Sequence, residues 1–248
     1  MSDPKIIVFD DLDSTSAEAR RRALTGEAGP VWLMARRQSA GHGRRGRAWA
    51  TGEDNLAATL LFTLDMPPLQ AAQLGFVTAL AVADLIDTYV PTALVRLKWP
   101  NDVLIDGRKT AGILIESGPA AAGGLWVSVG VGVNLVSFPK DVEQPATALA
   151  EALREDVARA PNQDEAMERL AAAFQQRFGQ WIDQGFEVIR QAWLKRALGL
   201  GLPCSARLPG QSIEGVAESL DADGALLIRL PDHSLARVAA GDVFFGIT

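Results

Sequence analysis

The residues best placed to do chemistry lie in one short basic segment, from Gln38 to Trp49. Three glycines and three arginines fall within 41–47, and no acidic residue lies between Met34 and Gly52. Glycine lets backbone N–H groups approach a ligand, and arginine offers a planar fork of donors that matches carboxylate or phosphate. Because the whole chain has a formal net charge of −6, this local positive charge predicts a site for a small anion. A solvated basic loop is the alternative for the segment taken alone.

Three more segments with polar side chains follow, two of which also contain glycines. They are Lys98–Asp102 (KWPND), Gly107–Leu114 (GRKTAGIL) and Gly130–Asn134 (GVGVN). Pro100 favours extended backbone at the residue before it, so the first segment presents polar side chains at a strand end or turn. The Asp106–Gly107 pair predicts a tight hairpin turn. Lys109 therefore begins a rigid strand, on which a point charge can be aimed.

Composition excludes several classes of catalyst. With one cysteine, Cys204, and two histidines, the chain has poor material for a Cys–His pair and none for a zinc-ligand cluster. No serine stands in a nucleophile-elbow pattern. We therefore expect chemistry by positioning and electrostatics, as in phosphoryl or nucleotidyl transfer. The lone cysteine, which we expect in a strand, fits a reducing cytoplasm, and no signal peptide or long apolar run indicates export or a membrane span.

The elements that must position these residues follow from hydrophobic periodicity. Strands are predicted at 5–10, 31–36, 56–64, 94–97, 103–105, 111–115 and 125–133, and helices at 15–26, 68–89 and 145–198. Thr15 to Glu18 has capping-box spacing. Strands and helices fall in blocks, which favours an α+β fold. In the last helical region one apolar stripe is predicted to face the core: Met167, Leu170, Phe174, Phe178 and Ile182.

Taken in this order, these four segments resemble those of the biotin protein ligase family over about residues 5–136. The resemblance implies a class II synthetase-like biotin/lipoate ligase domain at 1–200, with a mixed or antiparallel sheet and flanking helices. It also implies a small SH3-like β-barrel at 203–248, where short strands alternate with turn sequences. Only about four residues precede Lys5, so we expect a short form without a DNA-binding domain.

The resemblance also implies a two-step reaction. The biotin carboxylate attacks the α-phosphate of ATP to give biotinoyl-5′-AMP and pyrophosphate, and an acceptor lysine then attacks the adenylate. ATP, Mg²⁺ and biotin are expected as substrates, with no tightly bound cofactor. The expected partner is the biotin carboxyl carrier domain of acetyl-CoA carboxylase or a related carboxylase. We expect a cytoplasmic monomer or homodimer that binds neither nucleic acid nor membrane.

Site residues carry over by position in these segments. Lys109 matches the lysine that bridges the biotin carboxylate and the α-phosphate, and Arg44 matches the arginine that holds the adenylate. Asp102 is placed to ligate Mg²⁺ or to orient the incoming lysine. The biotin-binding candidates are Ser14, Thr15, Gln38, Gly41, His42, Gly43, Arg44, Lys109, Gly112, Gly130 and Gly132. The ATP-binding candidates are Arg44, Arg45, Arg47, Trp49, Lys98, Asn101, Lys109 and Asn134. Trp99 is expected in the core.

Two positions depart from the family pattern. His42 stands where the family usually has arginine, and Ser39 replaces the commoner threonine or glutamine. We expect His42 to act mainly through its backbone, because three arginines within five residues already supply charge. The alternatives for the chain are a lipoate–protein ligase, a non-catalytic sensor of biotin or adenylate, and an RNA-binding module, which the acidic overall charge disfavours.

Overall fold

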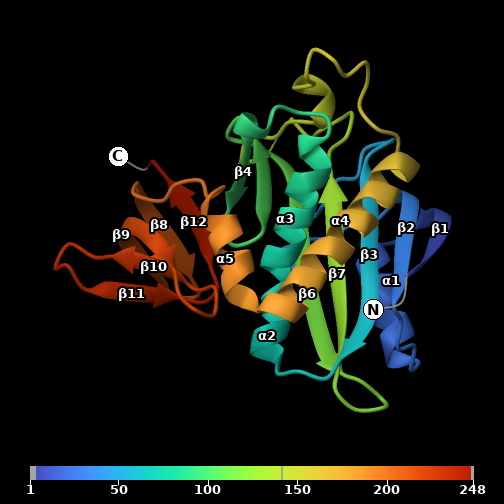
Figure 1. Cartoon of the computed structure of the whole chain (residues 1–248), viewed down its shortest axis with the longest axis horizontal. Helices are drawn as coiled ribbons and strands as arrows, with labels where there is room; N and C mark the ends of the chain where they lie inside the picture. Colours follow the sequence, from blue (N-terminus) through green and yellow to red (C-terminus); the bar gives the residue numbers. More distant parts are fainter. Residues whose placement is uncertain (1–3, 141, 247–248) are drawn as a thin grey trace.

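The computed structural model describes residues 4–140 and 142–246, which form two sheets and five α-helices (Figure 1). The larger sheet has the order β1-β2-β3-β7-β6-β5-β4. Its strands are β1 (Lys5–Leu12), β2 (Val31–Gln38), β3 (Leu56–Leu64), β4 (Val95–Lys98), β5 (Asp102–Ile105), β6 (Arg108–Pro119) and β7 (Leu125–Val133). β1 pairs with β2 in parallel, and the other neighbours are antiparallel. The predicted α+β class with a mixed sheet is therefore confirmed.

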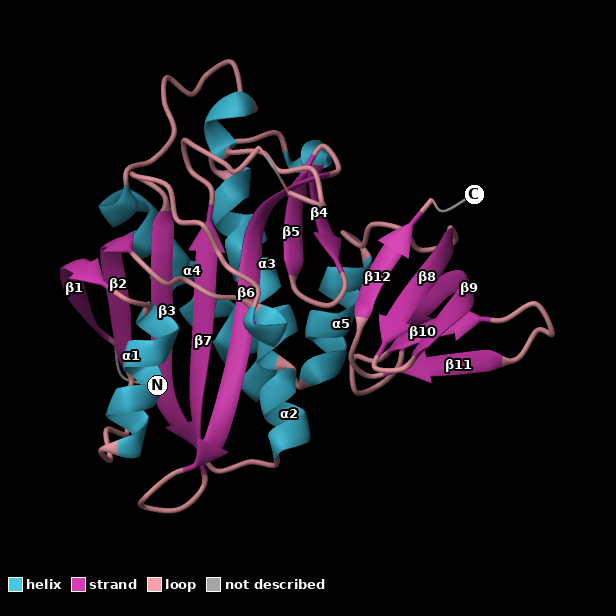
Figure 2. Ribbon diagram, turned by 180° about the vertical axis from the view of Figure 1, so that it is seen from behind, coloured by secondary structure: helices cyan, strands magenta, loops and turns pink. Residues whose placement is uncertain are grey.

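Helices cover both faces of this sheet. Their bounds are α1 (Thr15–Leu24), α2 (Pro68–Ala72), α3 (Leu74–Asp87), α4 (Gln163–Gln184) and α5 (Phe186–Leu194). Figure 1 shows α3 and α4 in front of the sheet, and the reverse view in Figure 2 shows α1 in front of it. Ala19 and Ala23 of α1 pack with Leu33, Leu61 and Trp126 in a small core of their own. The main core lies on the α3–α4 side.

The two central strands were predictable because both are apolar on both faces. β3 and β7 begin and end at the predicted residues and pair along their full length, from Leu56 with Val133 to Leu64 with Leu125. A strand buried on both sides reads as a continuous apolar run, and the short length of these runs favours a strand over a buried helix. The hairpin turn at Asp106–Gly107 is also confirmed, with both residues in the left-handed region.

The predicted helix at 145–198 is wrong over its first third. Residues 145–162 contain only a short 3₁₀ turn, Leu149–Glu151, and α4 begins after Asn162. Asn162 accepts a hydrogen bond from Glu165 N, and the Glu165 carboxylate accepts one from Asn162 N, which completes a capping box. The backbone before it is used elsewhere: Pro145 O accepts from Lys109 N, and Thr147 N donates to Lys109 O. Pairing with β6 overrides the helical composition of this segment.

Three smaller expectations also need correction. The predicted helix at 68–89 is two helices that meet at Gln73, and Leu69 is 55% exposed. The cap of α1 is Ser14 rather than Thr15, since Ser14 Oγ accepts from Ala17 N. On α4, Ile182 is 52% exposed while the other four stripe residues are buried, because the buried face continues from Phe178 to Trp181 and not to Ile182.

One helical stretch of the described residues, Pro68–Asp87, is long and apolar enough to cross a membrane. Of its most apolar window, 78% is buried inside the protein. It is flanked by the sheet and by α4, so its apolar character is that of a core element.

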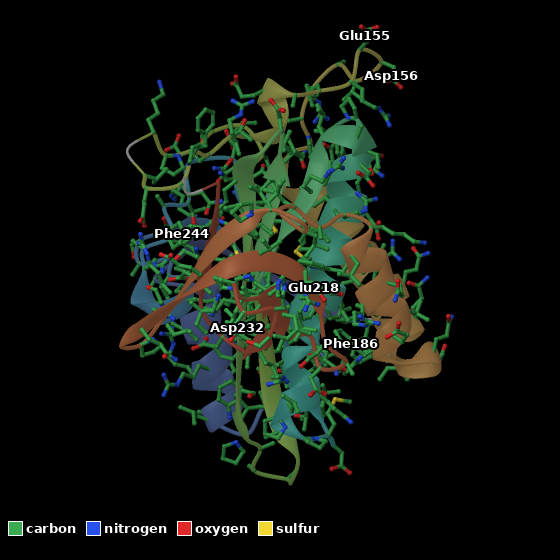
Figure 3. The ribbon with its side chains drawn as sticks, turned by 90° about the vertical axis from the view of Figure 1, so that its left-hand side faces the viewer. Glu155, Asp156, Phe186, Glu218, Asp232 and Phe244 are labelled. Atoms are coloured by element: carbon green, nitrogen blue, oxygen red, sulfur yellow. The ribbon has the colours of Figure 1, made fainter. Side chains whose placement is uncertain are left out.

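The smaller sheet, here called the C-terminal sheet, is antiparallel with the order β11-β10-β9-β8-β12. Its strands are β8 (Pro203–Leu208), β9 (Gln211–Leu220), β10 (Leu226–Arg229), β11 (Leu235–Val238) and β12 (Asp242–Phe245). This arrangement is consistent with the predicted SH3-like fold, and Cys204 lies buried in β8 as expected. Trp99 is buried at the junction, where its Nε1 donates to Gly224 O at 3.0 Å. Figure 3 looks onto this sheet, with Phe244 and Phe186 at opposite sides of the view.

The aromatic cluster between α4 and the larger sheet predicts that substitutions along α4 differ in how much they lower the free energy of unfolding. Phe174 is 1% exposed and packs against Trp32, Phe62 and Phe178. Phe174→Ala should lower the free energy of unfolding by about 3–5 kcal/mol, because it leaves a cavity in a close-packed core. Ile182→Ala on the same helix should cost less than about 0.5 kcal/mol. Urea unfolding of both variants tests the difference, and equal losses would contradict it.

Candidate active site

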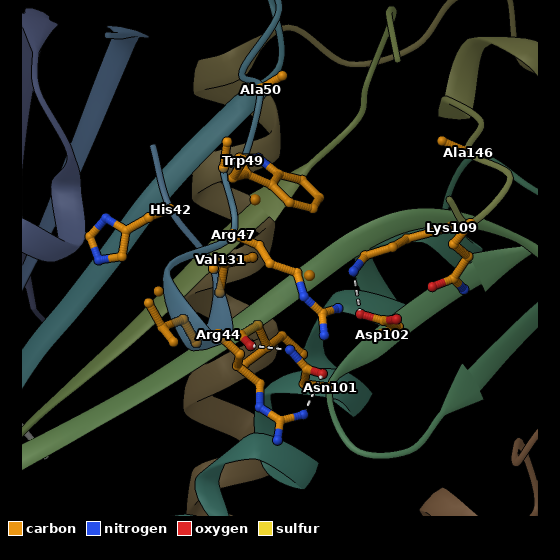
Figure 4. A pocket seen from close by; sticks show the side chains of 18 of the residues that line it. His42, Arg44, Arg47, Trp49, Ala50, Asn101, Asp102, Lys109, Val131 and Ala146 are labelled. Carbon is orange, nitrogen blue, oxygen red and sulfur yellow. Dashed lines mark hydrogen bonds and ion pairs between the residues drawn. The ribbon is translucent and has the colours of Figure 1, made fainter. Parts of the chain in front are cut away.

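A cavity of about 480 Å³ opens beside the middle of the larger sheet (Figure 4). Its walls come mainly from six parts of the chain: the start of α1, the basic loop after β2, the β4–β5 turn, the β5–β6 hairpin, the end of β7 and the segment 139–146. The C-terminal sheet adds a further wall through β12. The segments singled out in the sequence therefore converge on one space, although up to about a hundred residues separate them.

The structure brings nearly all of the predicted site residues to this cavity. Those that line it are Ser14, Thr15, Gln38, His42, Gly43, Arg44, Arg47, Trp49, Lys98, Asn101, Asp102, Lys109, Gly112, Gly130, Gly132 and Asn134. Gly41 and Arg45 are the exceptions. A Cβ on Gly41 would meet Trp49 O at 2.6 Å, so this glycine allows the two arms of the loop to pack closely against each other. Arg45 is not part of the cavity wall itself, but its guanidinium pairs at 2.9 Å with Asp242, which does line the cavity.

At the centre, Lys109 Nζ lies 2.5 Å from Asp102 Oδ1. Asp102 begins β5 and Lys109 lies at the start of the neighbouring β6, so strand pairing holds the two side chains together. The Asp102 side chain is 11% exposed and that of Lys109 is 26% exposed. Asp102 Oδ1 is buried and accepts no hydrogen bond from the described residues, so the Lys109 ammonium is its partner. The indole of Trp49 lies over Lys109, 5.6 Å from Nζ to the ring centroid.

A cluster of hydroxyl and amide groups forms the opposite end. Gln38 Oε1 accepts from Thr15 N at 2.8 Å, and Gln38 Nε2 donates to Thr51 Oγ1 at 3.0 Å. Thr59 Oγ1 donates to Thr15 Oγ1 at 2.8 Å. Ser14 Oγ lies 3.3 Å from His42 Nδ1. The polar atoms here are ordered by one another, which suits recognition of a neutral polar ring system.

Glycines on β6 and β7 let a flat ring lie directly on the sheet. A Cβ on Gly132 would come within 2.3 Å of the Trp49 indole nitrogen, and one on Gly112 within 3.0 Å of the same ring. A Cβ on Gly130 would meet Ser16 Oγ at 2.7 Å. Trp49 thus forms a wall of the cavity between the Lys109–Asp102 pair and the hydroxyl cluster.

Two more cations of the cavity wall, Arg44 and Lys98, are half-buried, and both are predicted ATP-binding residues. Arg44 Nη1 donates to Asn101 Oδ1 and to Gly241 O, each at 3.3 Å. Burial lowers the pKa of the Arg44 guanidinium, which nonetheless stays charged because its ordinary value is so high. Burial likewise lowers the pKa of the Lys98 ammonium, against the opposing attraction of Asp102. No carboxylate in the described part of the chain forms an ion pair with Lys98.

Asn134 has a structural partner in addition to its place in the cavity wall. Its Nδ2 donates to Thr147 O at 3.0 Å, and the side chain is buried. The amide therefore holds the segment after 145 against β7. Its contact with an adenine edge stays a prediction.

Several lining residues were missed by the sequence analysis. They are Asp242, Val243 and Phe244 of β12 and the residues Pro139, Val142, Glu143, Gln144 and Ala146. No short-range pattern connects position 242 with position 45, since almost 200 residues separate them along the chain. The only signal was the predicted C-terminal barrel, and that prediction does not say which of its strands faces the site.

Comparison with known proteins agrees with this geometry. The biotin/lipoate A/B protein ligase family matches residues 12–134, and the biotin protein ligase C-terminal domain matches residues 199–246. The biotin–[acetyl-CoA-carboxylase] ligase of Paracoccus denitrificans is 41% identical over 94% of this chain and 98% of its own length. The chain belongs to the biotin protein ligase family.

Further relatives extend the comparison. The bifunctional ligase/repressor BirA of Bacillus subtilis is 30% identical over 97% of this chain and 74% of its own length. The biotin protein ligase of Aquifex aeolicus, solved in complex with biotin and ATP, has a TM-score of 0.79 at 23% identity, covering 98% of this chain and 99% of that one. That likeness shows that the two share the fold.

The close packing at Gly41 predicts a contrast between two glycines of the loop. Gly41→Ala should push the loop outward, because the new Cβ has backbone at 2.6 Å, whereas a Cβ on Gly43 meets nothing closer than 3.9 Å. Limited trypsin cleavage after Arg44, Arg45 or Arg47 should therefore speed up several-fold in Gly41→Ala and stay unchanged in Gly43→Ala. Equal cleavage of the two variants would contradict this placement.

Proposed function

We propose that this chain joins biotin to a lysine of a biotin carboxyl carrier domain, in two steps within the one cavity. The biotin carboxylate oxygen attacks the α-phosphorus of ATP, and the bond to the β-phosphate breaks to release pyrophosphate. The lysine amine of the acceptor then attacks the acyl carbon of biotinoyl-5′-AMP, and AMP leaves. Membership of the family supports this reaction, and the arrangement of the cavity supports the following roles.

The observation that carries the proposal is the convergence of Lys109, Arg44 and Lys98 on one cavity beside the buried carboxylate of Asp102. Two anions, a carboxylate and a triphosphate, repel each other and must meet in line. Fixed cations in a site of low dielectric offset that repulsion and stabilise the charge that develops on the phosphate. No covalent nucleophile is needed, because positioning and electrostatics suffice for transfer of this kind.

Lys109 is proposed to bridge the biotin carboxylate and the α-phosphate. Its Nζ carries three donors, of which one faces Asp102, so the others are free for the substrates. Arg44 and Asn101 are proposed to hold the adenylate, and the hydroxyl cluster around Gln38 to hold the ureido ring. Trp49 covers the junction between the two ligands, which limits access of water to the mixed anhydride.

Asp102 is proposed to orient Lys109 in the first step and the acceptor amine in the second. Magnesium enters as part of the MgATP substrate, where it neutralises phosphate charge. The donor set fits that view: within 4–140 and 142–246 no group of three His, Cys, Asp or Glu residues could hold an ion by itself. A magnesium ion that keeps its phosphates and waters needs only one or two carboxylates from the protein, and Asp102 is the one placed beside Lys109.

A lipoate–protein ligase is the nearest alternative, since the matched family includes lipoate enzymes. The match of residues 199–246 to the biotin protein ligase C-terminal domain favours biotin. A non-catalytic sensor is disfavoured because Lys109, Asp102 and Arg44 converge with cationic groups free for phosphate. A cytoplasmic location is proposed because the one cysteine is reduced and buried.

The reaction is tested by incubating the protein with biotin, MgATP and a carrier domain and measuring the intact mass of the carrier. We expect a mass gain of one biotinoyl group that requires all three components. The same assay with lipoate in place of biotin serves as the comparison. Transfer of lipoate but not biotin, or transfer of neither, would overturn the proposal.

Lys109→Ala should lower the single-turnover rate of adenylation far more than the affinity for biotin. Its charge matters most where charge develops on the α-phosphate, so about 2–4 kcal/mol, or roughly 30- to 1000-fold, should be lost. Arg108→Ala, which removes the neighbouring cation of the same hairpin, is the matched control and should leave the rate unchanged. An adenylation rate of Lys109→Ala within about threefold of wild type would remove Lys109 from the proposed mechanism.

Arg44→Ser should release biotinoyl-adenylate into solution. The variant loses the contacts to Asn101 Oδ1 and Gly241 O that tie the loop over the cavity, and a mobile glycine-rich loop then favours the open state. Bystander lysines, for example on albumin, should be biotinylated in its presence. Arg20→Ser, which removes an exposed arginine from α1, should not label them. If adenylate escape is the same in both variants, Arg44 does not retain it.

A further inference from the structure

The loop arginines are held in place by the C-terminal sheet. Arg45 Nη1 pairs with Asp242 Oδ2 at 2.9 Å, and Arg47 Nη2 contacts the same oxygen. Arg44 Nη1 donates to the carbonyl of the preceding residue, Gly241, at 3.3 Å. The side chains of three arginines in one loop therefore contact two adjacent residues, Gly241 and Asp242, at the start of β12.

The alternation of β12 turns two side chains toward the cavity. Asp242 and Phe244 are two residues apart, so they lie on the same face of the strand. Both line the cavity, as does Val243 between them, whose side chain is 2% exposed and packs in the core. The ring of Phe244 lies beneath two cations, with its centroid 5.6 Å from Lys98 Nζ and 4.2 Å from Arg207 Cζ.

We propose that β12 is a working part of the nucleotide site, in which Asp242 positions Arg45 and Arg47, and Phe244 positions Lys98, to receive the triphosphate of ATP. This inference rests on the proposed function. Asp242 and Phe244 are positioning residues: they act through these three cations and need no contact with the substrate themselves.

Asp242 could instead compete with phosphate for the arginines, and the geometry argues against that. Each guanidinium uses one terminal nitrogen on Asp242 and keeps the rest of its five-donor fork free. Arg45 and Arg47 carry like charges two residues apart, so without a shared anion they would repel each other and separate. Their side chains are 42% and 60% exposed, which leaves their free donors open to an incoming anion. Asp242 therefore holds the two guanidinium groups close together and leaves most of their N–H donors free to bind phosphate.

Phe244 holds Lys98 through a cation–π contact and not through an ion pair. This lysine has no ion pair among the described residues, and burial already disfavours its charge, as the lowered pKa shows. The face of an aromatic ring attracts a cation without neutralising it. Lys98 therefore stays available to a phosphate oxygen while its ammonium is held near the cavity.

The test compares Asp242→Asn, Asp242→Glu, Phe244→Leu and Phe244→Tyr with wild type. Glu218→Gln is the matched control, because Glu218 also pairs with an arginine on the C-terminal sheet but lies away from Phe244 (Figure 3). Three quantities are measured: MgATP affinity without biotin by calorimetry, the KM for ATP and for biotin in pyrophosphate exchange, and transfer from preformed biotinoyl-5′-AMP to a carrier domain. Thermal unfolding of each variant reports on folding.

Asp242→Asn should weaken MgATP binding and raise the KM for ATP about tenfold, with the KM for biotin and the transfer from preformed adenylate within about twofold of wild type. Phe244→Leu should show the same pattern at about threefold. Asp242→Glu and Phe244→Tyr should restore most of the affinity, and Glu218→Gln should match wild type. Such a split between ATP and biotin is not produced by a general loss of folding.

Three results would overturn the proposal. Tighter MgATP binding by Asp242→Asn would mean that the carboxylate competes with phosphate. Unchanged binding in both Asp242→Asn and Phe244→Leu would make these contacts ordinary surface interactions. A defect confined to transfer from preformed adenylate would mean that β12 docks the acceptor. If wild type binds MgATP but biotinylates nothing, the proposed function fails, while the calorimetric comparison still tests β12.

Discussion

The ion pair between Lys109 and Asp102 is the interaction on which the rest of the site depends. Any enzyme that joins two anions must concentrate cations, and concentrated cations repel one another before the substrates arrive. Asp102 offsets this repulsion at the centre of the site, where its buried carboxylate holds Lys109 at 2.5 Å. The pairing of β5 with β6 fixes both backbones, so the charge is aimed by strands rather than by a loop. A rigid support matters here because small displacements weaken electrostatic catalysis.

Glycine and tryptophan set the shape around that centre. Gly112 and Gly132 lie on neighbouring antiparallel strands and pair directly with each other, so together they expose a flat area of backbone. The indole of Trp49 covers this area and at the same time lies over Lys109. The basic loop thus reaches the sheet through one large side chain, while its glycines keep the backbone free to move. A loop built in this way can open for substrates and still close over an intermediate that water would destroy.

The family is evident from short segments in the first 134 residues, and the reason is physical. Glycines at close approaches, a turn sequence before Lys109 and a run of arginines are local requirements, so they leave local marks. Strands β3 and β7 were predicted to the residue because burial on both faces requires a continuous apolar run. The hairpin at Asp106–Gly107 was equally clear, since few residues adopt its left-handed backbone.

What the sequence by itself determined was therefore the fold class, the central strands and the residues that converge on the cavity. Only the tertiary structure decided the conformation of the segment 145–162. Its Pro145 and Thr147 backbone groups pair with Lys109 of β6, so the segment cannot form the helix that its composition favours. The tertiary structure also decided that Ile182 faces solvent while Phe178, four residues earlier, is buried, since the buried face of α4 continues through Trp181 instead. Finally it placed Asp242 against Arg45 and Arg47. A contact between residues nearly 200 positions apart leaves no periodicity, spacing or turn to read, because it arises only from how one folded unit docks on another.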